Sequence, residues 1–183
     1  MTRRSVLVSV VLVLAAVACS KKEGGGGGGG ELSKYPGTEE GAKKLLTDIR
    51  SGDAAAMTKA LKPTSDDYKA VFVEGAAAKA ESAYEKLWSD PKAVIGADPA
   101  NTELLLWKAT TDELQKGAGD ASNFPGGYKK VADKFKPGLT VYRWKYVKPG
   151  KDTGMAFDGL VHVNGHWAWF PKPWRAVGGD GGE

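Results

Sequence analysis

Seven consecutive glycines, Gly24 to Gly30, lie near the start of the 183-residue chain and divide it in two. Glycine loses more conformational freedom on folding than any other residue, so such a run holds neither a helix nor a strand. The folded part is therefore predicted over residues 31–177, followed by a disordered tail over residues 178–183. A segment of about 150 residues is long enough for one domain with a substantial hydrophobic core.

The residues before Cys19 have the pattern of an export signal. Arg3 and Arg4 supply positive charge, and residues 6–18 form an apolar run that ends in small side chains. This run is shorter than the ~20 residues that a membrane-spanning helix needs. Residues 1–18 are therefore predicted to be a signal peptide that is removed after export. The short charged segment favours the general export route, with twin-arginine export as the alternative.

The end of the apolar run, Ala15-Ala16-Val17-Ala18-Cys19, resembles the bacterial lipobox. The resemblance implies a diacylglycerol on the Cys19 sulfur and a membrane anchor, with residues 19–30 as the lipidated cysteine and a flexible tether. The family favours Leu where this chain has Ala16. Because the chain has no other cysteine, an exported form without lipid would carry an unpaired thiol. The alternative is cleavage by an ordinary signal peptidase, which prefers A-x-A sites and would release a soluble protein.

The lipobox resemblance implies a location in the cell envelope. Ser20 lacks the acidic side chain that this family associates with inner-membrane retention, which implies the outer membrane, facing the periplasm, if the source has two membranes. The formal net charge is +4, and removal of Arg3 and Arg4 brings it closer to zero. Nucleic-acid binding usually requires a basic stripe, so no nucleic-acid partner is expected.

Helix signals dominate the first half of the folded part. A polar capping residue precedes apolar residues at helical spacing three times. These signals predict helices over residues 38–52, 53–61 and 65–90, the last one ended by Pro91. The sequence Thr110-Thr111-Asp112-Glu113 fits a capping box that opens another short helix, and residues 128–135 form a further amphipathic segment.

Strand signals dominate the second half. The apolar pattern predicts strands over residues 94–95, 103–107, 139–147, 155–163 and 166–170. Asn164-Gly165 between two alternating runs is a strong hairpin signal. The predicted fold is therefore α+β, with N-terminal helices packed on a C-terminal antiparallel β-meander.

This order of elements, with Gly165-His166-Trp167 in the last strand, resembles the cone-shaped α+β domains related to nuclear transport factor. The resemblance covers residues 38–174 as a succession of elements. It implies a pocket without implying a reaction, because the same fold class includes isomerases, dehydratases and binding modules.

Strand pairing across Asn164-Gly165 predicts one candidate binding face, because side chains alternate between the two faces of a sheet. Uninterrupted alternation places Arg143, Lys145, Asp158, His162, Trp167 and Trp169 together. The opposite face, with Tyr142, Trp144, Tyr146, Phe157 and Phe170, is predicted to lie under the helices. Charge beside exposed indole rings suits sugars, peptides or anions. The alternative is structural, with the indoles buried or covered by basic side chains.

The sequence contains no recognisable catalytic or cofactor motif. Asp158 and His162 would lie about 13 Å apart on one strand, which is too far for an acid–base pair. Two histidines without a clustered carboxylate or thiol predict no metal site. The sequence therefore favours a non-enzymatic envelope lipoprotein, without cofactor, whose domain is structural or binds a protein, glycan or small molecule. Two alternatives stay open: a small pocket enzyme using His162 and Asp158, and a cell-wall glycan-binding lipoprotein using Trp167, Trp169 and Trp174.

Overall fold

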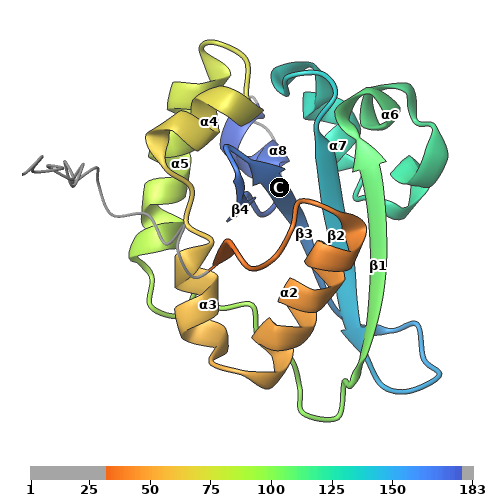
Figure 1. Cartoon of the computed structure of the whole chain (residues 1–183). Coiled ribbons are helices and arrows are strands. Elements are labelled where there is room, and N and C mark those ends of the chain that lie inside the picture. Colours follow the sequence, from red (N-terminus) through yellow and green to blue (C-terminus); the bar gives the residue numbers. More distant parts are fainter. Residues whose placement is uncertain (1–31, 179–183) are drawn as a thin grey trace, which may run out of the picture.

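The structure is a computed structural model that describes residues 32–178 (Figure 1). Its helices are α2 (Glu39–Ser51), α3 (Ala54–Ala60), α4 (Ser65–Val71), α5 (Ala76–Ser89), α6 (Thr111–Lys116), α7 (Gly127–Val131) and α8 (Pro173–Val177), with 3-10 turns η1 (Gly119–Asn123) and η2 (Ala132–Lys134). The strands are β1 (Glu103–Thr110), β2 (Thr140–Val147), β3 (Gly154–Val163) and β4 (His166–Trp169). The predicted α+β fold is confirmed. The predicted signal peptide, the tether with Cys19 and the tail beyond residue 178 lie outside the described residues.

Polar caps start several helices at the predicted residues. Thr38 accepts a hydrogen bond from the Gly41 N–H at the start of α2, and Asp53 caps α3 in the same way. The predicted capping box at the start of α6 is present, with the Thr110 and Glu113 side chains each bonding the other's backbone N–H. Local sequence therefore sets these helix starts.

The single helix predicted over residues 65–90 is wrong, because the chain leaves helical geometry between α4 and α5. Phe72 forms an isolated antiparallel bridge with Phe135, and both side chains are buried. The Val73 N–H donates to the Lys134 carbonyl at 2.9 Å. Gly75, at φ +82°, then starts the second helix. The break is made by a contact with a distant segment, which helix periodicity does not report.

The strand predicted over residues 94–95 is also wrong. Ile95 is buried, and its N–H donates to the Thr58 hydroxyl at 3.0 Å instead of to a strand. Helix α8 was not predicted from the sequence. It begins at Pro173, a residue whose fixed φ suits the first turn of a helix, and residues 170–172 join it to β4.

The four strands form an antiparallel meander in the order β1-β2-β3-β4. The predicted hairpin register is confirmed, with Val163 opposite His166 and Leu160 opposite Trp169. Asn164 and Gly165 both have positive φ, at +51° and +80°, as the tightest hairpin turns require. The two-residue turn therefore fixes the pairing of β3 with β4.

A β-bulge at Gly159 interrupts the alternation of β3. Tyr142 pairs with Leu160, but the next residue of β2, Arg143, pairs with Asp158, so Gly159 has no partner in β2. Gly159 has φ +87°, and a Cβ there would lie 1.9 Å from the Phe170 carbonyl oxygen. Only glycine fits this position, and the side chains before it are shifted to the opposite faces.

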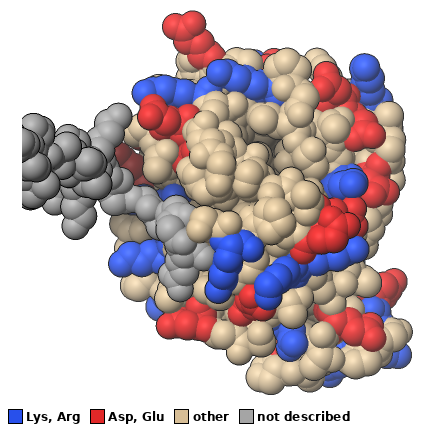
Figure 2. All heavy atoms as spheres, in the orientation of Figure 1, with Lys and Arg blue, Asp and Glu red and all other residues tan. Residues whose placement is uncertain are grey.

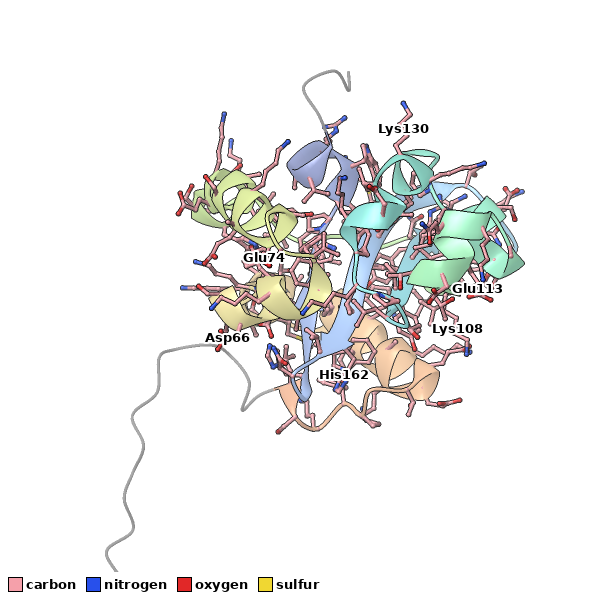
Figure 3. All side chains as sticks on the ribbon, turned by 90° about the horizontal axis from the view of Figure 1, so that it is seen from above. Asp66, Glu74, Lys108, Glu113, Lys130 and His162 are labelled. Carbon is pink, nitrogen blue, oxygen red and sulfur yellow. The ribbon has the colours of Figure 1, made fainter. Side chains whose placement is uncertain are left out.

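Helices cover both faces of the sheet and create two hydrophobic cores. The first core lies between the sheet and α4, α5, α7 and α8, and contains Phe72, Tyr84, Tyr128, Val161 and Phe170 among others. The second core lies between the sheet and α2, and contains Leu32, Tyr35, Leu46, Trp144 and Trp167 among others. Figure 3, a view from above, shows α2 on one side of the sheet and α7 and α8 on the other. Trp88 packs against both cores.

Candidate functional site

The six residues predicted to form one binding face do not share a face. Pairing with β2 places Asp158 beside Arg143, on the side of Lys145, whereas β4 pairing places His162, Trp167 and Trp169 on the opposite side. The Gly159 bulge is the reason, because it shifts the alternation by one residue between Asp158 and Leu160. The predicted face is therefore wrong.

Trp167 and Trp169 are buried, as the structural alternative supposed. Their exposed fractions are 0% and 5%, and both lie in the second core. The Trp167 indole N–H donates to the Tyr35 carbonyl at 3.0 Å, and the Trp169 indole N–H donates to the Asp158 carbonyl at 2.8 Å. Neither ring offers the flat exposed surface on which a sugar could stack.

Arg143 and Lys145 cover another aromatic ring. The Arg143 guanidinium lies 5.2 Å from the centre of the Trp107 ring, and the Lys145 ammonium lies 5.8 Å from it. Arg143 also donates to the Asn123 carbonyl, and Lys145 donates to the Asp152 carbonyl at 3.0 Å. Both side chains are thus engaged in covering Trp107 on the edge strand β1.

His162 is separated from Asp158 by the sheet itself. Its ring packs edge-on against Trp167 at 5.1 Å between ring centres, on the α2 side (Figure 3). Burial, with a smaller contribution from His166, lowers the pKa of His162. The two residues named as acid–base candidates therefore form no pair.

A cavity of about 420 Å³ opens between α5, the first half of β3 and the segment that joins β4 to α8. Leu87, Phe157 and Trp169 contribute apolar walls. A cavity of this size, mostly apolar with a few polar groups, has the usual character of a small ligand site. It is therefore the candidate binding site of this domain.

Asp158 is the buried polar group of this cavity, with 7% of its surface exposed. Its Oδ1 accepts hydrogen bonds from the Tyr128 hydroxyl and from the Lys172 backbone N–H, both at 2.9 Å. Burial raises the pKa of Asp158, and these hydrogen bonds and nearby positive charges act in the opposite direction. Lys172 holds its N–H in place with a left-handed backbone, at φ +49°.

Two cations lie at the mouth of the cavity. Lys172 and Arg175 line it from the start of α8, and both side chains are exposed. Neither forms an ion pair with another residue between 32 and 178. The mouth is therefore positively charged and open to an anionic group.

Met155 extends the apolar wall outward. It is 55% exposed, and it is the one large hydrophobic residue exposed in the part of the chain that the structure describes. Methionine is flexible and polarisable, and it is common on surfaces that adapt to a ligand. Met155 lines the same cavity as Lys172 and Arg175.

Sequence reasoning identified Asp158 but missed Met155, Lys172 and Arg175. An isolated glycine inside a strand pattern signals a bulge, so Gly159 could have corrected the face of Asp158. The two cations had no such signal, because α8 was not predicted.

Elsewhere, Figure 2 shows Lys and Arg interspersed with Asp and Glu on the face that it presents.

Within residues 32–178, no three His, Cys, Asp or Glu side chains come together to hold a metal ion. No helix in the same range is long and apolar enough to cross a membrane. No family model, curated protein or solved structure matches the chain.

Proposed function

We propose that this protein is a lipid-anchored protein of the cell envelope whose folded domain is a non-catalytic binding module. The observation that supports the binding role is the cavity between α5, β3 and α8. Its apolar walls and the exposed cations Lys172 and Arg175 complement a ligand with an apolar body and an anionic group. The buried Asp158 carboxyl adds one polar contact inside.

The anchor in this proposal is a lipid on Cys19, supported by the lipobox-like sequence before it. Two or three acyl chains give stable membrane binding, whereas a single chain binds only marginally. The residues from Ser20 to Gly30 would give the tether a typical reach of roughly 18 Å. The binding cavity would then operate close to a membrane surface.

Replacement of Cys19 tests the anchor. We expect the wild-type protein in the membrane fraction, with an intact mass that includes the lipid, and the Cys19→Ser variant outside that fraction. Ser20→Ala is the matched control, because it changes the neighbouring residue and leaves the sulfur in place; it should stay with the membrane. A Cys19→Ser protein that still fractionates with the membrane would contradict the anchor.

Binding of 8-anilinonaphthalene-1-sulfonate, an aromatic sulfonate, tests the cavity. The mature protein is held in nanodiscs, and its fluorescence titration is corrected with empty nanodiscs. Reversing both mouth cations, Lys172→Glu with Arg175→Glu, should weaken binding by about tenfold or more, since each exposed charge pair contributes up to ~1 kcal/mol. Lys116→Glu, remote from the cavity, is the control. Equal affinities of the double variant and the control would reject the cavity as the binding site.

A further inference from the structure

The first half of β3 has an unpaired edge. β4 pairs with β3 only from Leu160 to Val163, so the residues from Gly154 to Asp158 have a neighbouring strand, β2, on one side alone. Figure 1 shows β4 as the shorter strand. Four consecutive residues, Met155 to Asp158, line the cavity. Because alternate side chains point to opposite faces, a cavity that touches four in a row runs along the backbone edge.

The backbone groups that face this edge can be assigned. The Asp158 carbonyl accepts the Trp169 indole N–H at 2.8 Å on the β4 side. Alternate residues of a strand direct their N–H and C=O groups to the same edge, so Ala156 presents both of its groups there. Ala156 is exposed, and outside the sheet no described backbone group bonds to it. It offers one donor and one acceptor to an incoming strand.

Helix α5 forms the opposite wall of the cavity, through Ala83, Tyr84 and Leu87. The cavity is therefore a groove between a strand edge and a helix. Grooves of this kind bind extended peptides by strand addition, in which backbone hydrogen bonds give affinity and pockets for alternate side chains give specificity. Met155, Phe157 and Trp169 supply the apolar surface for such side chains.

The charge of the groove sets the direction of the peptide. Lys172 lies at the Asp158 end of the edge, where its N–H bonds the Asp158 carboxylate, and Arg175 follows in α8. A peptide that runs parallel to Met155–Asp158 brings its carboxyl end to these two cations. The negative charge of Asp158 is outnumbered there, and its Oδ1 already accepts two hydrogen bonds.

We propose that the groove between β3 and α5 binds the carboxyl-terminal end of an extended apolar peptide. The peptide adds a parallel strand beside Ala156, places apolar side chains against Met155 and Trp169, and sets its terminal carboxylate beside Lys172 and Arg175. This inference rests on the proposed binding role of the same cavity and names its ligand. The step is non-covalent, so binding is reversible.

Labelled peptides test this inference on the mature protein in nanodiscs. The probes are fluorescein-Ser-Val-Thr-Val-X peptides in which X is Ala, Val, Leu, Met or Phe, measured by fluorescence anisotropy against empty nanodiscs. We expect saturable binding of at least one probe. Its amidated form should bind about tenfold more weakly, because it loses charge-assisted contacts with the two cations. Two further forms carry N-methyl groups on alternate residues, one on the odd-numbered residues and one on the even-numbered residues. At least one of these two forms should not bind, because its methyl groups replace the N–H groups that face β3.

Two variants of one residue test the backbone contact. Ala156→Pro removes the N–H that faces the groove, at an unpaired edge where proline is tolerated, and should abolish peptide binding. Ala156→Ser keeps that N–H and should bind the peptide as the wild type does. If Ala156→Pro does not fold, the N-methylated peptides decide the question with the unaltered protein.

The outcomes separate this inference from the proposed function. If the aromatic sulfonate binds at the cavity but no peptide binds, strand addition is overturned and the cavity still binds small anions. Peptide binding that survives both N-methylation registers and amidation also overturns it. If neither the sulfonate nor a peptide binds, the proposed function fails. Association of two protein copies that peptides do not inhibit would assign the edge to a second copy instead.

Discussion

Asp158 is buried in the sheet and accepts three hydrogen bonds, two at its carboxyl group and one at its backbone carbonyl. The Tyr128 hydroxyl and the Lys172 N–H bond its Oδ1, and its own carbonyl accepts the Trp169 indole N–H. Burial nevertheless raises the pKa of Asp158 above its ordinary value. The protonated carboxyl is therefore favoured more in the folded protein than in the unfolded chain.

This shift predicts how stability depends on pH at this residue. The unfolded carboxyl has a pKa of about 3.9. Because the folded pKa is higher, the stabilisation from Asp158 is complete below the unfolded pKa and is lost as the pH rises through the folded pKa. Asp158→Asn stays neutral and keeps an oxygen for Tyr128 and Lys172. We therefore expect the unfolding free energy of the wild type, relative to Asp158→Asn, to fall as the pH rises.

Urea unfolding of both proteins between about pH 3.5 and pH 7 measures this difference, because that interval brackets the unfolded pKa and the range above it. A wild-type advantage that grows with pH would contradict the prediction. It would mean that the hydrogen bonds to Oδ1 stabilise the carboxylate by more than burial costs it.

At the same residue scale, side-chain alternation predicted the hairpin but not the site. The register of β4 on β3 was predictable, because a two-residue turn at Asn164-Gly165 determines which residues of the two strands pair. The placement of Asp158 does not follow from alternation alone, because Gly159 adopts φ +87° under the Phe170 carbonyl and takes one residue out of the pairing with β2. Alternation is a local rule, whereas the backbone of Gly159 lies against Phe170, the residue that follows β4, and the Phe170 N–H donates to the Gly159 carbonyl.

At the scale of elements, Asp67 joins α4 to the β3–β4 hairpin. It is fully buried, and its carboxylate accepts from the Thr64 N–H at 2.7 Å and the Thr64 hydroxyl at 2.8 Å. It also accepts from the Asn164 side chain at 2.8 Å, and the His166 Nε2 lies 3.0 Å from it. One carboxylate thus caps a helix and holds a turn that lies far away in sequence.

Removal of this carboxylate should affect both elements. We expect Asp67→Ala to lower the unfolding free energy by about 3–4 kcal/mol, because the hydrogen bonds from Thr64, Asn164 and His166 to one buried carboxylate are lost at once, at about 1 kcal/mol each. Asp66→Ala is the matched control: its side chain is 83% exposed and contacts only Lys69 among the ion pairs, so stability should change little. Figure 3 shows Asp66 at the outside of α4. Urea unfolding measures both, and equal effects would contradict the role of Asp67.

Element boundaries were predictable where the signal is local. The caps at Thr38, Asp53 and Thr110 act within one turn of their own helices and lie where the sequence predicts them. The break between α4 and α5 depends on the bridge from Phe72 to Phe135, between segments far apart in the chain. Helical spacing continues through that break, so periodicity alone predicts one long helix.

At the scale of the whole molecule, one sheet separates two hydrophobic cores. Trp88 packs against both, and every strand contributes residues to each face. Unfolding of either layer of helices would therefore expose one face of the sheet on which the other layer packs. We expect the two cores to unfold together, as is usual for a domain of this size.

Substitutions in each core test this coupling. Leu46→Ala lies in the second core and Val71→Ala in the first, and both wild-type residues are fully buried. Each should lower the unfolding free energy by about 1–4 kcal/mol, and the double variant should show the sum, because the two residues lie in different cores. Far-ultraviolet circular dichroism and tryptophan fluorescence should report one coincident urea transition for every variant. Two separate transitions would show that the cores unfold independently.

The burial of Leu32 and Tyr35 has a mechanical consequence. A pull on the chain at this end is transmitted into the interior, because both side chains lie in the second core and the Tyr35 carbonyl accepts the Trp167 indole N–H. The hydrogen bond between the Tyr35 carbonyl and Trp167 passes this force on to β4. A force that pulls Leu32 and Tyr35 out of the second core would expose the Trp167 indole to solvent.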